Sequence, residues 1–109
     1  MTEALDVLGD PVRRRLLEVL ALGSQSAGAL GEVIREEFGI SQSAVSQHLK
    51  VLRQRGFVSV SVQGRSRIYH LEEAPLRAAE AWFEQLRSIF GEPLEALATE
   101  VERGKRETT

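Results

Sequence analysis

The sequence contains no cysteine, and none of its apolar runs is long enough to cross a membrane. A chain without cysteine can form no disulfide, no thiolate metal site and no thiol-based redox switch. A membrane-spanning helix needs about 20 apolar residues in succession. The first residues, Met1 to Asp6, lack the basic segment and apolar stretch of a signal peptide, so we expect a cytoplasmic location.

Acidic residues are missing from one continuous part of the chain. The net charge is −2, yet residues 39–71 contain no Asp or Glu and carry a charge of +5, while the remaining 9 basic and 16 acidic residues sum to −7. The five cations are Lys50, Arg53, Arg55, Arg65 and Arg67. A basic, acid-free segment in an acidic protein indicates a surface that binds a polyanion. The alternative is a solvated basic face without a ligand.

Apolar residues at helical spacing predict three successive helices. They begin at Pro11, Ala27 and Gln42, and they end near Gly23, at Phe38 and at Arg55. Each follows a residue that can accept hydrogen bonds from free N–H groups of the first turn, namely Asp10, Ser26 and Ser41. We also expect Gly23 to act as a left-handed C-terminal cap. A short helix over Glu3 to Leu8 precedes them, with Leu5 and Leu8 facing inward.

After Gly56 the pattern changes from helical to alternating, which predicts a β-hairpin with a turn over residues 63–66. In its first strand Val58, Val60 and Val62 are expected on one face, and Phe57, Ser59 and Ser61 on the other. In its second strand, Arg67 to Leu71, we expect Ile68 and His70 to face the interior of the sheet, with His70 as a packing residue.

A last strong helix is predicted from Pro75 to Phe90. Its apolar stripe consists of Leu76, Ala79, Phe83, Leu86 and Phe90, widened by Trp82 and Ile89. This stripe exceeds what so small a core needs, which favours burial against a second copy of the chain. Alternatively, it covers its own domain. We expect one domain over residues 1–92 and a weakly helical, then disordered tail over residues 93–109.

The predicted fold is mainly α-helical with one β-hairpin, an α+β winged helix-turn-helix. The second and third helices, joined by the short turn Gly39 to Ser41, form a helix-turn-helix whose third helix fits the major groove of DNA. Its polar, acid-free face can read base edges and bind phosphate. We expect DNA contacts from Ser41, Gln42, Ser43, Ser46, Gln47, His48 and Lys50, and from Arg65 and Arg67 in the hairpin.

Several of these residues have simpler explanations. Ser41 caps its helix in any case, and His48 and Arg65 are also compatible with solvated surface positions. The run Arg13 to Arg15, at the start of the first strong helix, could contact phosphate, pair with Glu18 or pair across a dimer.

Four segments carry a resemblance to a known family: Leu8 to Pro11 with Arg13, Arg14, Leu16 and Leu17, then Ser41 to Leu52, Gly56 to Val58 and Gly64 to Tyr69. Over about residues 5–90 the chain resembles the ArsR-type winged helix-turn-helix repressors. The resemblance implies a homodimer built from the first and last helices. The interface would hold Leu5, Leu8, Leu76, Ala79, Trp82, Phe83, Leu86 and Phe90.

The sequence departs from the metal-sensing members of that family. Their Cys-x-Cys pair is absent, and the last helix offers Glu80 and Glu84 without histidine, so we predict no metal site and no cofactor. The leading hypothesis is a non-enzymatic transcriptional regulator, and repression at a palindromic operator is its specific form. The alternatives are a nickel-, zinc- or ligand-responsive regulator of the same fold, or a winged helix that binds another protein.

Overall fold

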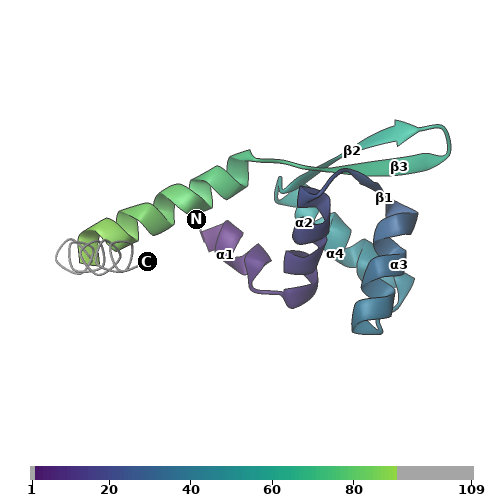
Figure 1. Cartoon of the computed structure of the whole chain (residues 1–109), viewed down its shortest axis with the longest axis horizontal. Helices are drawn as coiled ribbons and strands as arrows, with labels where there is room; N and C mark the ends of the chain where they lie inside the picture. The colour runs from purple at the N-terminus through teal and green to yellow at the C-terminus, as the bar shows by residue number, and fades with distance from the viewer. Residues whose placement is uncertain (1, 91–109) are drawn as a thin grey trace, which may run out of the picture.

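The computed structural model describes residues 2–90 of the 109-residue chain, and the side chains of residues 4–90 (Figure 1). The labelled elements are α1 (Thr2–Leu8), α2 (Pro11–Ala21), β1 (Gln25–Ser26), α3 (Ala27–Phe38), α4 (Gln42–Gln54), β2 (Val58–Gln63) and β3 (Ser66–Leu71). Residues 74–90 form a further helix, called here the C-terminal helix. The predicted α+β class is confirmed. The tail predicted over residues 93–109 lies outside the described residues.

The three predicted N-caps form as expected. The Asp10 carboxylate accepts hydrogen bonds from the backbone N–H groups of Val12 and Arg13, at 2.8 and 3.2 Å. The Ser26 and Ser41 hydroxyls cap α3 and α4 in the same way, at 3.1 Å. The prediction for Gly23 is wrong. Helix α2 ends in Leu22 with right-handed geometry, because the chain then extends through Gly23 directly into β1.

The core lies between α2, α3, α4 and the sheet. Its most deeply buried side chains are Val7, Leu16, Leu30, Ile34, Val45, Leu49, Leu52 and Phe57. The expected inward position of Leu5 is wrong, since 42% of this residue is exposed. Ala4 and Val7 are buried instead, because a short helix presents a single stripe to α2 and Leu5 lies one step around the axis from it.

The sheet has three antiparallel strands in the order β1-β3-β2. Val60 pairs with Tyr69, so the buried Tyr69 shares the face of the valines that packs on the helices. The prediction that Ile68 and His70 face this interior is therefore wrong, since alternate residues of a strand point to opposite faces. Val62 lies on the inner face but is 72% exposed, because the hairpin extends beyond the helices.

Two further features of the sheet differ from the expected pattern. Strand β1, which pairs with β3 at Gln25 and Ser26, was not predicted because two residues are too few to show alternation. Phe57 precedes β2 and is buried like Val58, although strict alternation placed them on opposite faces.

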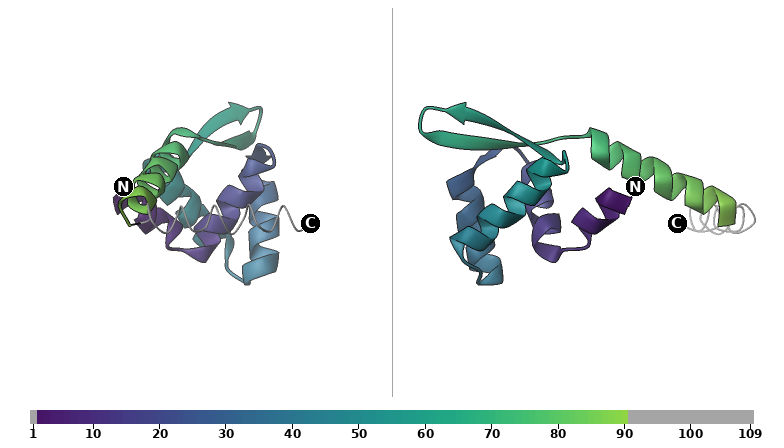
Figure 2. Two further views of the ribbon diagram at one scale, coloured as in Figure 1. Left: turned by 60° about the vertical axis from the view of Figure 1, so that its left-hand side comes forward. Right: turned by 180° about the vertical axis from the view of Figure 1, so that it is seen from behind.

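The C-terminal helix projects away from the body of the molecule (Figures 1 and 2). Only its beginning packs on the core, where Ala79 is buried and Leu76 is half-buried. Helix α1 lies at the same end of the molecule, while the hairpin of β2 and β3 extends from the opposite end. Within residues 2–90, none of the helices has the length and apolar composition to traverse a bilayer.

Candidate nucleic-acid interface

Helices α3 and α4 form a helix-turn-helix. Helix α3 ends in Gly39, whose left-handed backbone (φ 65°) suits glycine, and the Gly39 N–H donates to the Arg35 carbonyl at 2.9 Å. Ser41 then caps α4. Because α4 buries Val45, Leu49 and Leu52 against the core, its opposite side faces solvent.

The solvent side of α4 carries the polar residues predicted to contact DNA. We call this side the outer face of α4, and it comprises Ser43, Ser46, Gln47 and Lys50, all exposed. Ser41 and Gln42 are also exposed, at the start of the helix. The outer face offers hydroxyl, amide and ammonium groups in one row and contains no carboxylate, which suits the floor of a major groove.

His48 is the exception among the predicted residues of α4. It lies on the side of the helix that faces α2, and its side chain is 22% exposed. Its Nδ1 lies 4.0 Å from the Oδ1 of Asp10, the N-cap of α2.

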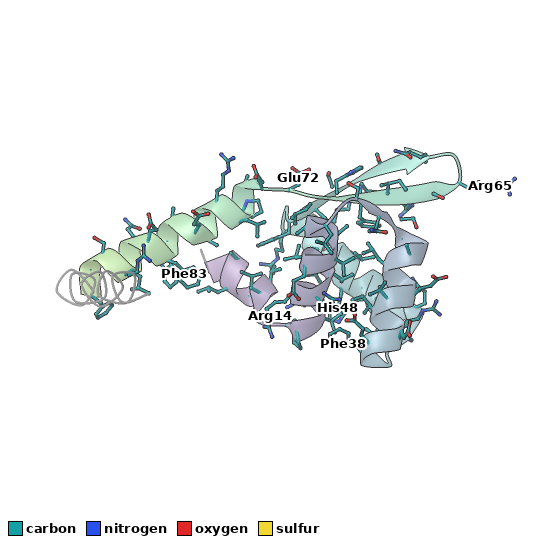
Figure 3. All side chains as sticks on the ribbon, in the orientation of Figure 1. Arg14, Phe38, His48, Arg65, Glu72 and Phe83 are labelled. Carbon is teal, nitrogen blue, oxygen red and sulfur yellow. The ribbon has the colours of Figure 1, made fainter. Side chains whose placement is uncertain are left out.

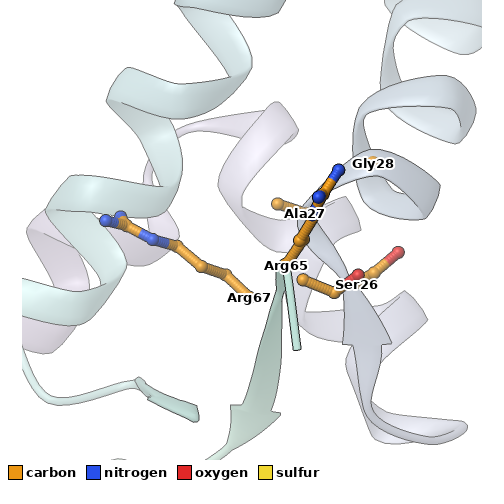
Figure 4. A pocket seen from close by; sticks show the side chains of 6 residues that line it. Ser26, Ala27, Gly28, Arg65 and Arg67 are labelled. Atoms are coloured by element: carbon orange, nitrogen blue, oxygen red, sulfur yellow. The ribbon is translucent and has the colours of Figure 1, made fainter. Parts of the chain in front are cut away.

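The hairpin forms a wing with a basic tip. Gly64 has a φ of 63° and Arg65 an ordinary φ, which is the glycine-first pattern of a type II′ turn. Arg65 points away from the body at the end of the wing (Figure 3). Together with Ser66 and Arg67 it lines a hollow whose other wall is the first turn of α3, formed by residues 26–28 (Figure 4). Two arginines and the first turn of α3 therefore border the same space, a combination that favours phosphate.

The cations of the molecule divide into engaged and free groups. Arg15 pairs with Glu37 at 2.8 Å, and the guanidinium hydrogen bond lowers the pKa of Glu37. Arg55 lies 3.7 Å from the Asp6 carboxylate. Within residues 4–90, by contrast, no hydrogen bond or ion pair engages the side chains of Lys50, Arg53, Arg65 and Arg67. Within the described part of the chain these free cations all belong to α4 and the wing, where they are available to a polyanion.

Comparisons with known proteins agree with this arrangement. Residues 8–61 match the helix-turn-helix domain family. The transcriptional repressor SdpR of Bacillus subtilis is 32% identical over 82 residues, which cover 75% of this chain and 87% of SdpR.

Solved structures of transcriptional regulators share the fold. One described as a possible transcriptional regulator for arsenical resistance is 35% identical, with a TM-score of 0.67 over 90% of this chain and 95% of its own. An ArsR family transcriptional regulator is 25% identical, with a TM-score of 0.73 over 84% of this chain and 90% of its own. The chain belongs to the ArsR-type winged helix-turn-helix transcriptional regulators. It is thus a DNA-binding transcriptional regulator, as the sequence motifs predicted.

Arg13 and Arg14, for which the sequence left several roles possible, connect α1 to α2 in this ArsR-type protein. The Arg13 guanidinium donates to the carbonyls of Val7 and Asp6, at 2.9 and 3.0 Å, and Arg14 donates to the Leu8 carbonyl at 2.7 Å. Neither contact could be read from hydrophobic periodicity, because both depend on how the chain turns between the two helices.

His70 fixes the base of the wing. On the outer side of the sheet its Nδ1 lies 2.7 Å from the Ser24 hydroxyl and its Nε2 lies 2.7 Å from the Ser61 hydroxyl. One imidazole therefore joins the loop before β1 to both strands of the wing. Within residues 4–90 no group of three or more metal-ligating side chains gathers around it or elsewhere.

Gly31 was not singled out in the sequence, yet it determines where a recognition residue lies. It is buried on α3 directly against the side chain of Gln42, the first residue of α4. A Cβ at position 31 would collide with the end of that side chain. The space left by the glycine thus lets Gln42 fold back over α3.

Replacing Gly31 with alanine should turn Gln42 outward without unfolding the protein. Alanine favours a helix over glycine by about 1 kcal/mol, and the group it displaces is the end of a flexible side chain. We expect little change in thermal stability but an altered base preference opposite the start of α4, measured by binding to duplexes that differ at single positions. Gly31→Ala combined with Gln42→Ala should remove this alteration. An unchanged preference in Gly31→Ala would show that the direction of Gln42 has no part in DNA binding.

Proposed function

We propose that this regulator binds a palindromic operator as a homodimer and represses transcription from the promoter that the operator overlaps. The apolar stripe of the C-terminal helix carries the proposal. Beyond Ala79 it leaves the core, and Phe83, Ile89 and Phe90 are 51%, 76% and 72% exposed. Such an apolar surface favours association, and α1, which lies at the same end of the molecule, adds Leu5, which is 42% exposed.

A second copy of the chain is the partner that fits this surface. In a two-fold dimer the same stripe serves both subunits, so each C-terminal helix would cover its counterpart. Leu8, Leu76, Trp82 and Leu86 are half-buried along the same region and would be covered further. Ala79 is already buried within one chain, so in our proposal it holds the C-terminal helix on the core and is not itself covered by the partner. The two α4 helices would then enter major grooves about one helical turn apart, which calls for a palindrome.

Within each half-site we assign base reading to the outer face of α4. The amide of Gln47 can pair with adenine, and Lys50 can reach a guanine edge or a phosphate. Ser43 and Ser46 can bond to bases or to the backbone, with Ser41 and Gln42 at the entrance of the groove. Arg65 and Arg67 would hold the adjacent minor groove or its phosphates.

The proposed binding of a dimer to promoter DNA also accounts for repression and for the cellular location. A dimer seated on a promoter excludes polymerase, and the similar protein SdpR is named a repressor. The proposed action needs binding alone, without catalysis. A protein that occupies promoter DNA works where that DNA lies, which in a prokaryote is the cytoplasm.

A salt titration of DNA binding should distinguish a phosphate contact by Lys50 from a base contact by Gln47. The probe is a duplex enriched by the wild-type protein from a library with a randomised core of roughly 30 base pairs, enough for two half-sites. Lys50→Ala should weaken binding and reduce the slope of log affinity against log salt by about one for each phosphate that the lysine no longer neutralises. Gln47→Ala should leave the slope unchanged and relax the preference for one base pair, at a cost of about 1–3 kcal/mol.

Two results would contradict the proposal. If no sequence is enriched, the protein lacks operator specificity. If both variants bind as the wild type does, the outer face of α4 does not contact DNA. A reporter gene behind the enriched sequence tests the direction of regulation, and its expression should fall when the regulator is produced.

A further inference from the structure

The end of α1 and the beginning of α2 form a single junction. The Arg13 and Arg14 guanidinium groups bind the last carbonyls of α1, where positive charge is favoured by the helix dipole. Asp10 lies between the helices and holds the first N–H groups of α2. Because its carboxylate is anchored by two backbone hydrogen bonds, it offers a fixed negative charge to any neighbouring element.

Helix α4 and its C-cap, Arg55, meet this junction at two points. His48 Nδ1 lies 4.0 Å from Asp10 Oδ1, and Arg55 Nη2 lies 3.7 Å from Asp6 Oδ2. His48 and Arg55 are seven residues apart, so they share one stripe of the helix, separated by about two turns. The outer face of α4, with Ser43 and Lys50, points in a different direction.

We infer that His48 is a positioning residue, which sets the orientation of the recognition helix by pairing with Asp10 and does not read a base. Arg55 supports it two turns further along by its contact with Asp6. The junction of α1 and α2 would thus link the proposed dimer surface to the helix that enters the groove. This inference rests on the proposed contact between the outer face of α4 and DNA.

The surroundings of the pair suit this role. The side chains of His48 and Asp10 are 22% and 30% exposed, so solvent screens them less than a fully exposed pair. Burial raises the pKa of Asp10, but the N–H groups of Arg13 and Val12 and the charge of His48 outweigh it, and the pKa lies below its ordinary value. The carboxylate is therefore ionised at every pH at which the protein would be assayed.

The substitution Asp10→Asn tests whether Asp10 positions α4 or only contributes a negative charge. The two cases predict opposite changes in DNA affinity. Asparagine caps a helix as well as aspartate does, so α2 keeps its N-cap. Removing a negative charge from a DNA-binding protein should tighten binding by simple electrostatics. If Asp10 positions α4 through His48, binding should instead weaken, by roughly two- to fivefold for a partly exposed pair. Glu36→Gln removes the same charge from an exposed position on α3 and should not weaken binding.

A double-mutant cycle identifies the partner. Binding of Asp10→Asn, His48→Gln and the double variant is measured with the enriched duplex, after thermal unfolding has shown which variants are folded. We expect the double variant to bind no more weakly than the weaker single variant, and the base preference of His48→Gln to match that of the wild type. If His48→Gln does not fold, the sign of the Asp10→Asn effect decides alone. Two results would overturn the inference: tighter binding by Asp10→Asn, or a changed base preference in His48→Gln.

Discussion

A variant with glutamate in place of Phe83 should be a monomer that binds the operator at least about a hundredfold more weakly than the wild type. Phe83 is 51% exposed on the apolar stripe and makes a T-shaped contact with Trp82, with ring centroids 5.1 Å apart. In a two-fold interface each substitution occurs twice, so two carboxylates would be buried without partners. The loss in affinity follows because a monomer holds only one half-site, and linked binding contributes roughly a hundredfold or more.

The control for this variant is Gln85→Glu. It adds the same charge to the same helix, at an exposed position on the opposite side from Phe83. It should remain a dimer with nearly unchanged affinity. Sedimentation velocity gives the oligomeric state, and fluorescence anisotropy with the enriched duplex gives the affinity. If Phe83→Glu sediments as the wild type does, the stripe is not the interface, and the proposed palindromic mode of binding loses its basis.

The helices of this protein could be predicted from the sequence because their signals are local. Asp10, Ser26 and Ser41 cap the helices that follow them within three residues along the chain. The inward residues of α3 and α4 recur at helical spacing, since each helix buries one stripe. Strand β1 carries no such signal. It exists only because Gln25 and Ser26 meet β3, more than 40 residues away in the sequence.

Errors arose where a residue's side depended on contacts between distant segments. Alternation grouped His70 with Ile68 correctly, but it could not tell which side of the sheet faced the helices. That choice is made by Tyr69, which lies opposite Val60 on the buried face. An apolar residue at position 68 therefore gave a misleading signal for the whole strand.

In the candidate interface, too, local patterns could be predicted and contacts between distant segments could not. The outer face of α4 could be predicted, because polar residues without acids recur opposite an apolar stripe. The place of His48 could not, since it lies between the buried and exposed sides, where only the packing of α2 decides its partner. The contact of Gly31 with Gln42 was equally hidden, as it depends on how closely α3 and α4 approach.

Phe57 is the residue whose loss should cost the most stability, because it joins the recognition helix to the wing. Phe57 is only 1% exposed. Its N–H donates to the Leu52 carbonyl near the end of α4, and its carbonyl accepts from Glu72 just after β3, both at 2.9 Å. The ring thus fills the core at the point where α4, β2 and the end of β3 meet.

Phe57→Ala should lower the free energy of unfolding by about 3–5 kcal/mol, the usual cost of such a cavity. The total for a small domain is only about 5–15 kcal/mol, so we expect a fall in Tm of roughly 15 °C or more, and no DNA binding at temperatures where the wild type still binds. Urea unfolding at one fixed protein concentration measures the change, since dimerisation would add to apparent stability. Val62→Ala, also in the hairpin but 72% exposed, should cost less than about 0.5 kcal/mol. A decrease below about 1 kcal/mol in Phe57→Ala would mean that the wing and α4 are held together by other contacts.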